Sequence, residues 1–303
     1  MEQLKITLPI FSLSGIGYIS RVLIKKQNWT VQLNRFVYYI SLPALIVFYF
    51  SQLEWSGDVL GIIVFNCIVL AISAIILLPI SLLITSKKPL QAAFFLTSIV
   101  SNSIYLGIPL AQRAYGDGTV NAIAISSVIQ LVGGILLSVV AIEYFFLRSN
   151  NIRSVIKHVI NNPLFIGVLI GLAFMVISNN SWYGSTIEIP IKMLAATASP
   201  VALFALGSFM YGHVRHKHLY LVIIATVVKL LVYPFIAFVL ARAVHISSED
   251  AGVTIMMCAM PTAVTAFVLS QKYKLDSAFV ANTMLLSTLA SVAISPVWLS
   301  AVK

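Results

Sequence analysis

The sequence is poor in charged residues, and this scarcity excludes most classes of soluble protein. Only 9 % of the 303 residues are charged, whereas soluble domains have about 25 %. The chain also lacks a GxxxxGK[ST] phosphate loop, so it has no ATP-binding module of that type. It lacks HExxH and GxSxG motifs and clustered aspartates, which argues against an intramembrane enzyme. Its two cysteines, Cys67 and Cys258, lie inside apolar runs and are interpreted as packing residues.

Apolar residues dominate the composition of the chain. The chain is 60 % hydrophobic and has a mean hydropathy of +1.00. A helix needs about 20 apolar residues to cross a bilayer, and we predict an all-α integral membrane protein with ten such spans and no soluble domain. The predicted spans lie near residues 5–25, 31–51, 59–84, 90–113, 119–147, 155–177, 190–211, 218–241, 249–271 and 277–300. In the sixth span, Gly167-x-x-x-Gly171 predicts close helix packing.

The positive charges are distributed unevenly along the chain. If residue 1 lies outside, thirteen of the nineteen Lys and Arg residues fall in loops on the inner side of the membrane. Cytoplasmic loops of membrane proteins carry such an excess. The pattern predicts a multi-pass protein of the cell membrane with both termini outside, in contact with the lipid bilayer and not with nucleic acid.

Prolines recur at corresponding places in the two halves of the chain. Three pairs are separated by 154, 157 and 152 residues, and these are Pro9 with Pro163, Pro43 with Pro200, and Pro109 with Pro261. Three matches in order predict an internal duplication, with residues 1–150 as one five-helix repeat and residues 151–303 as the other. Because each repeat has an odd number of spans, the second is inverted. Inverted repeats with one interrupted helix each are typical of secondary transporters.

Pro109 and Pro261 fall in the middle of spans 4 and 9. Proline removes a backbone donor and clashes with the carbonyl four residues earlier, so a break there is stable only where protein, water or ligand meets the freed groups. We predict that the second half-helices begin at about these prolines and that their N-termini converge. Two helix N-termini would suit an anion such as a carboxylate. A simple proline kink is the alternative.

The residues around both breaks resemble the auxin efflux carrier family. NSIYLGIPL at 102–110 is similar to the family's span 4 motif, in which an asparagine precedes Gly-Ile-Pro by the same spacing. MPTA at 260–263 is similar to its span 9 segment, and LPIF at 8–11 and the stretch 34–45 match as well. The resemblance covers nearly the whole chain.

This resemblance implies broken helices in spans 4 and 9, a scaffold part and a moving transport part, and a homodimer. It implies export of organic acids, such as indole acetate in plants and malate in some bacteria. The substrate-binding residues that it implies are Asn102, Gly107, Ile108, Pro109, Met260, Pro261 and Thr262. The chain departs from the plant exporters at Thr262, where they often have glutamine, and in having only about ten residues near 148–157, where many carry a long insertion. Auxin itself is therefore not implied.

Lys229 lies near the middle of span 8. A charge there costs at least about 2.5 kcal/mol on insertion scales, so we expect a partner or a cavity. Three roles stay open: a counter-charge for an anionic substrate, an internal cation that pairs with half-helix carbonyl ends, and a lysine that only holds its helix in place. Among the uncharged polar residues inside spans, Asn102 and Gln130 are costly to bury, and we place both in the substrate site.

The chain has no acidic residue at the predicted membrane midplane. Glu143 lies near the inner end of span 5, where it would pair with Arg148. No metal or cofactor is expected, and His213, His216 and His218 are interpreted as part of a basic loop. We therefore predict a secondary transporter that exports small organic anions by alternating access. A proton- or sodium-coupled transporter of the same architecture, an anion channel and a sensor are the alternatives.

Overall fold

The computed structural model describes residues 2–24, 29–51, 59–116, 119–146, 160–177, 187–211, 218–244 and 246–302. Side chains are described from residue 12 onward, except those of 120, 175–177 and 199. The described residues form helices joined by short non-helical segments, and they form no strand, as expected where backbone groups must be satisfied inside a lipid-embedded segment. The predicted all-α fold is confirmed. The predicted repeat boundary at residue 150 lies outside the described residues, as do Arg148, His213 and His216.

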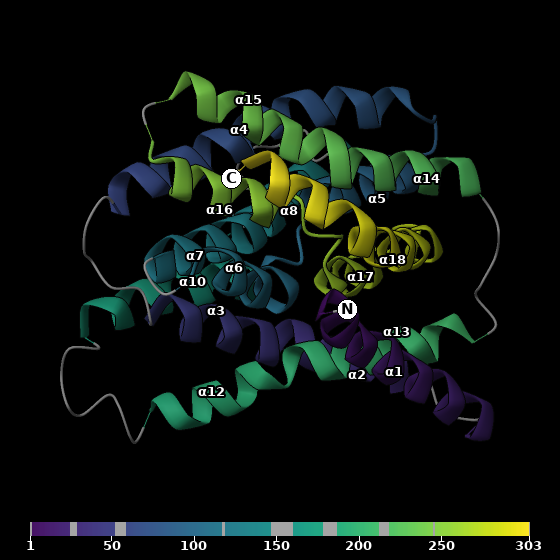
Figure 1. The fold of residues 1–303 in the computed structure, drawn as a ribbon. Coiled ribbons are helices and arrows are strands. Elements are labelled where there is room, and N and C mark those ends of the chain that lie inside the picture. The colour runs from purple at the N-terminus through teal and green to yellow at the C-terminus, as the bar shows by residue number, and fades with distance from the viewer. Residues whose placement is uncertain are drawn as a thin grey trace.

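The lower layer in Figure 1 contains helices from both halves of the chain. It consists of α1 (Glu2–Leu23), α2 (Trp29–Phe36), the π-helical segment η1 (Val37–Ser41), α3 (Leu42–Ser51), α10 (Pro163–Ile177), α12 (Glu188–Ala196) and α13 (Ala198–Met210). In this layer α1 packs along α13, and α3 packs along α10.

Glycines allow these helix pairs to approach closely. A Cβ on Gly17 of α1 or on Gly207 of α13 would meet the backbone of the other helix. A Cβ on Gly167 would lie 3.1 Å from the backbone of Pro43, and one on Gly171 would lie 2.6 Å from the side chain of α3's Phe50. The packing role predicted for the glycines of span 6 is therefore confirmed.

The upper layer contains the remaining described helices. These are α4 (Val59–Leu83), α5 (Lys88–Ile99), η2 (Ser103–Gly107), α6 (Ile108–Tyr115), α7 (Val120–Val128), η4 (Ile129–Gly133), α8 (Gly134–Ala141), η5 (Ile142–Phe146), α14 (Leu219–Val227), η6 (Val228–Val232), α15 (Tyr233–Ala243), α16 (Ser248–Cys258), α17 (Val264–Lys272) and α18 (Ser277–Val302). Of these, α17 also contacts α2 and α13, so it borders the lower layer (Figure 1).

Six helices in the described part of the chain are long and apolar enough to cross a membrane. They are Trp29–Ser51, Val59–Leu83, Asn121–Phe146, Glu188–Met210, Leu219–Ala243 and Ser277–Val302, and they coincide with six of the predicted spans. Predicted spans 4 and 9 are instead pairs of half-helices, α5 with η2–α6 and α16 with α17. The count of ten spans and their inverted arrangement stay predictions.

The centre of the core is formed by the two broken helices. All residues from 90 to 104 and from 251 to 270 are buried. A helix that is buried on every side is surrounded by protein, and irregular backbone at membrane depth is tolerated only in such a place or beside a water-filled cavity. The fold thus provides the environment in which a helix can be interrupted.

Candidate functional site

Both broken helices are interrupted where they cross. The first interruption, residues 100–102, separates α5 from η2, and the second, residues 259–263, separates α16 from α17. Ser101 and Thr262 face each other across the two interruptions as an antiparallel β-bridge. The convergence of two broken helices, predicted from the paired prolines, is confirmed.

The two interrupted segments satisfy each other's backbone groups. The N–H of Asn102 donates to the carbonyl of Pro261 at 2.8 Å, and the N–H of Ala263 donates to the carbonyl of Val100 at 3.1 Å. Unpaired backbone groups would be costly in a buried, apolar setting. Each break therefore stabilises the other, and the pairing holds the two following half-helices in a defined relative position.

The break in span 4 lies earlier than we predicted. The second half-helix was expected to begin at about Pro109, but helical structure resumes at Ser103, and Pro109 lies in the first turn of α6. The carbonyl of Asn102 accepts the N–H groups of Leu106 and Gly107, both at 3.2 Å, so the hydrogen-bond ladder restarts directly after the bridge as a π-turn. Pro109, which has no N–H to donate, follows this π-turn directly and lies inside the continuous half-helix η2–α6.

Gly107, Ile108 and Pro109 occupy three different environments. Gly107 is buried, and a Cβ there would lie 2.5 Å from the sulfur of Met257 and 3.2 Å from the side chain of Met260. Ile108 is half-buried and Pro109 is exposed. Gly107 packs against the other broken helix by leaving room for the methionines.

The break in span 9 includes Pro261, as predicted, and α17 begins at Val264. The side chain of Thr262 donates a 2.8 Å hydrogen bond to the carbonyl of Thr97, near the end of α5. Its N–H donates to the hydroxyl of Ser287 at 3.2 Å. Since the last carbonyls of a helix have no partner within that helix, Thr262 acts as a structural link between the two broken helices.

Each of the two half-helix starts carries one buried oxygen that has no partner in the described part of the chain. These are the amide oxygen of Asn102, which is 6 % exposed, and the hydroxyl of Thr265, which is 2 % exposed. Neither helix start has a side-chain cap. A buried polar group without a partner costs about 1–3 kcal/mol. Such atoms mark places where a water molecule or a ligand would bind.

Lys229 is fully buried and connects both breaks. Its ammonium donates to the hydroxyl of Ser101 at 2.6 Å and to the backbone carbonyl of Cys258, at the end of α16, at 2.7 Å. It also lies 4.5 Å from the ring centre of Tyr233. A cation at a helix C-terminus is favourable because the last carbonyls carry partial negative charge. This geometry matches the predicted pairing with a half-helix carbonyl end, and it equally suits a lysine that holds its helix.

Gln130 belongs to a hydrogen-bond network beside the crossing. Its oxygen accepts from the hydroxyl of Tyr233 at 2.5 Å, and its nitrogen donates to the oxygen of Asn66 at 3.0 Å. The nitrogen of Asn66 donates in turn to Ser126 and Thr254, both at 3.0 Å. Both ends of the Gln130 amide are thus used by the protein. Gln130 is placed to support Tyr233 and, through it, the lysine.

No group of His, Cys, Asp and Glu side chains within the described ranges could hold a metal ion. Glu143 lies in η5 and is half-buried. Its predicted partner Arg148 is outside those ranges.

Sequence reasoning missed three contributors to the crossing: Ser101, Tyr233 and the carbonyl of Cys258. Tyr233 lies four residues after Lys229, a spacing that places two side chains on one helix face, so it could have been found. For Ser101, the only sequence feature that could have indicated a role at the crossing is its position directly before Asn102. The carbonyl of Cys258 has no sequence signal, because every residue has a carbonyl.

Comparison with known proteins points to one family. A family model described as membrane transport protein matches the chain in two segments, residues 4–153 and 146–299. An uncharacterized transporter of Methanocaldococcus jannaschii is 25 % identical over 310 residues, which cover 98 % of each chain. An uncharacterized transporter of Methanothermobacter thermautotrophicus is 24 % identical over 323 residues, with the same coverage. Auxin efflux carrier component 5 of Arabidopsis thaliana is 22 % identical over 245 residues, 67 % of this chain and 68 % of that one.

Proposed function

Because the chain belongs to the membrane transport protein family, that of the auxin efflux carriers, we propose that it exports small organic anions across the cell membrane by alternating access. The observation that carries this proposal is the crossing. In a chain with only 9 % charged residues, two helices are broken at one buried place, and each half-helix start has an oxygen to which no described residue hydrogen-bonds. A protein without a ligand to bind there would gain stability from unbroken helices.

The anion binds at the N-terminal ends of η2–α6 and α17. Each helix start carries about half a positive charge and backbone N–H groups that are not used within the helix. Asn102 supplies an amide and Thr265 a hydroxyl, and both can hydrogen-bond a carboxylate. The backbone from Met260 to Thr262 lines the other side of the crossing. This arrangement recognises the negative charge of the substrate. The neighbouring side chains would contact the rest of the substrate and select its shape.

The two layers supply the parts that move relative to each other. The lower layer is the scaffold, and the upper layer, which contains both broken helices, carries the substrate. The pairing of α1 with α13 and of α10 with α3 supports an inverted repeat, because exchanging the two halves converts the first pair into the second. The orientation with both termini outside follows from the positive charge of the inner loops. The family resemblance also favours a homodimer, which light scattering of the purified protein tests.

Export needs no coupled ion in this mechanism. Lys229 takes the place of a coupling cation, since its ammonium already occupies the carbonyl end of α16. One charge moving through 100 mV is worth about 2.3 kcal/mol, so an anion leaving a negative interior could support an approximately fifty-fold gradient. A proton- or sodium-coupled transporter is the second candidate, and it would show flux that depends on that ion. An anion channel would show single-channel conductance steps in a planar bilayer.

The test is a thermal-shift screen of the purified protein against small organic acids, followed by flux measurements in proteoliposomes. We expect the acids that raise Tm to be transported, with efflux faster when the vesicle interior is negative. Flux that is indifferent to the imposed potential would show that transport is not electrogenic. If no acid raises Tm or crosses the membrane, organic anion export is wrong.

Asn102→Ala tests the site itself. We expect this variant to express normally and to lose the ligand-induced rise in Tm. Ser138→Ala is the matched control, because Ser138 is a buried residue whose hydroxyl bonds only the carbonyl of Gly134 in its own helix. An unchanged ligand response in Asn102→Ala would remove this residue from the site.

A further inference from the structure

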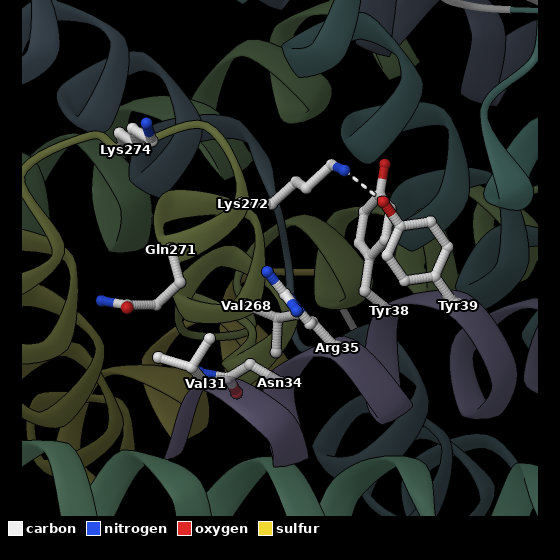
Figure 2. Close-up of a pocket in the computed structure, with 9 residues that line it drawn as sticks. All are labelled: Val31, Asn34, Arg35, Tyr38, Tyr39, Val268, Gln271, Lys272 and Lys274. Carbon is white, nitrogen blue, oxygen red and sulfur yellow. Dashed lines mark hydrogen bonds between the residues drawn. The ribbon is translucent and has the colours of Figure 1, made fainter. Parts of the chain in front are cut away.

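A cavity lies between the two layers, away from the crossing. Its volume is about 560 Å³, and its walls come from α2 and η1 of the lower layer and from the C-terminal end of α17 with the turn that follows (Figure 2). The other end of α17 begins at the crossing. Because α17 has nine residues, this cavity lies about 13 Å from the crossing along that helix.

Among the described residues, the charged side chains that line this cavity are all cationic. Arg35 comes from α2, and Lys272 and Lys274 come from the opposite wall (Figure 2). The ammonium of Lys272 hydrogen-bonds the hydroxyl of Tyr39 and lies 5.4 and 4.8 Å from the ring centres of Tyr38 and Tyr39. Cations on two facing walls repel each other in the absence of an anion between them.

The cavity also has a buried polar group that no protein atom satisfies. Asn34 is 4 % exposed and lines the cavity, and neither its amide oxygen nor its amide nitrogen has a partner in the part of the chain that the structure describes. Leaving both ends of a buried amide unsatisfied is costly. A bound molecule with oxygen atoms would satisfy this amide, and Arg35, the next residue in α2, can bind a carboxylate through two parallel hydrogen bonds.

We propose that this cavity is a second anion site, which captures a small dicarboxylate before it reaches the crossing. Cations on two walls fit an anion with a carboxylate at each end, and the tyrosine rings provide an apolar surface for the carbon chain between them. The capture role rests on the proposed export function. Under the predicted orientation the α17–α18 turn with Lys272 and Lys274 lies on the inner side, which is the side from which an exported anion arrives. A bound dianion would also connect the two layers.

Isothermal titration of the full chain in detergent with succinate tests the site. We expect the double variant Arg35→Gln, Lys272→Gln to bind succinate at least about tenfold more weakly, the effect of losing one charged hydrogen bond. Arg242→Gln, Lys192→Gln is the matched control, because these exposed cations also lie over aromatic rings but outside the cavity. Asn34→Asp, a nearly isosteric change that adds a negative charge, is expected to weaken binding as well.

Three outcomes would overturn the proposal. The first is an unchanged succinate affinity in the cavity double variant, and the second is an equal loss in the control. The third is binding of phosphatidylglycerol in mixed micelles with no binding of succinate, which would identify the occupant as a lipid headgroup.

Failure of this site and failure of the export function give different results. If the cavity binds succinate in a manner that depends on Arg35 and Lys272, and no organic acid is transported, the site stands and the export proposal fails. If export is observed with the same KM for the wild type and the cavity double variant, the capture role is wrong and export stands. Asn102→Ala is expected to leave succinate binding at this cavity unchanged.

Discussion

The two breaks at the crossing are built differently, although they occupy corresponding places in the chain. The break in span 9 contains Pro261, whereas the break in span 4, residues 100–102, contains no proline, and Pro109 follows it within a helix. Both breaks are held by the same antiparallel bridge. Proline is therefore not what keeps the first helix open, and both breaks share the mutual pairing of the two backbones.

The side chains that support the two breaks also differ. At the first break the hydroxyl of Ser101 accepts from Lys229, whereas at the second break Thr262 donates to α5. Lys229 is the residue that contacts both, since it also binds the end of α16. Two breaks held by the same backbone pairing can thus be stabilised by different side chains.

Lys229→Met is expected to have the largest effect, because it removes one group from both breaks. The buried carbonyl of Cys258 and the hydroxyl of Ser101 lose their donor, at a cost of about 1–3 kcal/mol each. We expect a fall in Tm of several degrees and loss of flux in proteoliposomes. Lys192→Met, at an exposed lysine, should change neither. A Lys229→Met variant with normal Tm and flux would show that the breaks do not depend on a shared cation.

Thr265→Val tests whether both half-helix starts bind the ligand. Its hydroxyl has no partner among the described residues, so the substitution should leave Tm without ligand unchanged. The loss of one hydrogen bond to a carboxylate should lower affinity about tenfold, measured by titrating the ligand-induced rise in Tm. If Thr265→Val keeps full affinity while Asn102→Ala loses it, the ligand is held by the first break alone.

Thr262→Val is expected to have a smaller effect, on stability and not on affinity. The carbonyl of Thr97 loses the hydroxyl that it accepts from, which should cost about 1 kcal/mol of unfolding free energy. Thermal unfolding beside the Ser138→Ala control measures this. A strong loss of ligand response at unchanged stability would instead place the Thr262 side chain in the binding site.

Pro261→Ala and Pro109→Ala should have the smallest effects, less than about 1 kcal/mol each. If the backbone pairing between the two breaks keeps residues 259–263 non-helical, these residues stay non-helical in Pro261→Ala. Hydrogen–deuterium exchange of residues 259–263 should then match the wild type. Stronger protection of these amides in Pro261→Ala would mean that the helix has closed and that proline is the cause of the break.

Sequence reasoning located the crossing through the two motifs that contain Asn102 and Pro261, and the structure places both residues in it. It misplaced the first break because it assigned the interruption to Pro109, which instead follows the π-turn η2 within a continuous half-helix. It placed Gln130 in the substrate site because a buried amide is costly. The structure shows that Tyr233 and Asn66 hydrogen-bond both ends of this amide, and its binding role stays a prediction. It did not identify the cavity at Arg35 and Lys272, whose walls are distant in the chain.

The amino-acid sequence is sufficient to establish that this is a helical membrane protein of a transporter family, because hydropathy, charge bias and motifs are properties of contiguous residues. It also identifies a buried lysine that must have partners. Which atoms those partners are, where the first helix opens and which amides stay unsatisfied depend on segments that lie from 29 to more than a hundred residues apart in the chain. The backbone N–H and C=O groups that one break leaves without helical partners are hydrogen-bonded only when the other break lies opposite them. The two breaks come together only in the folded protein.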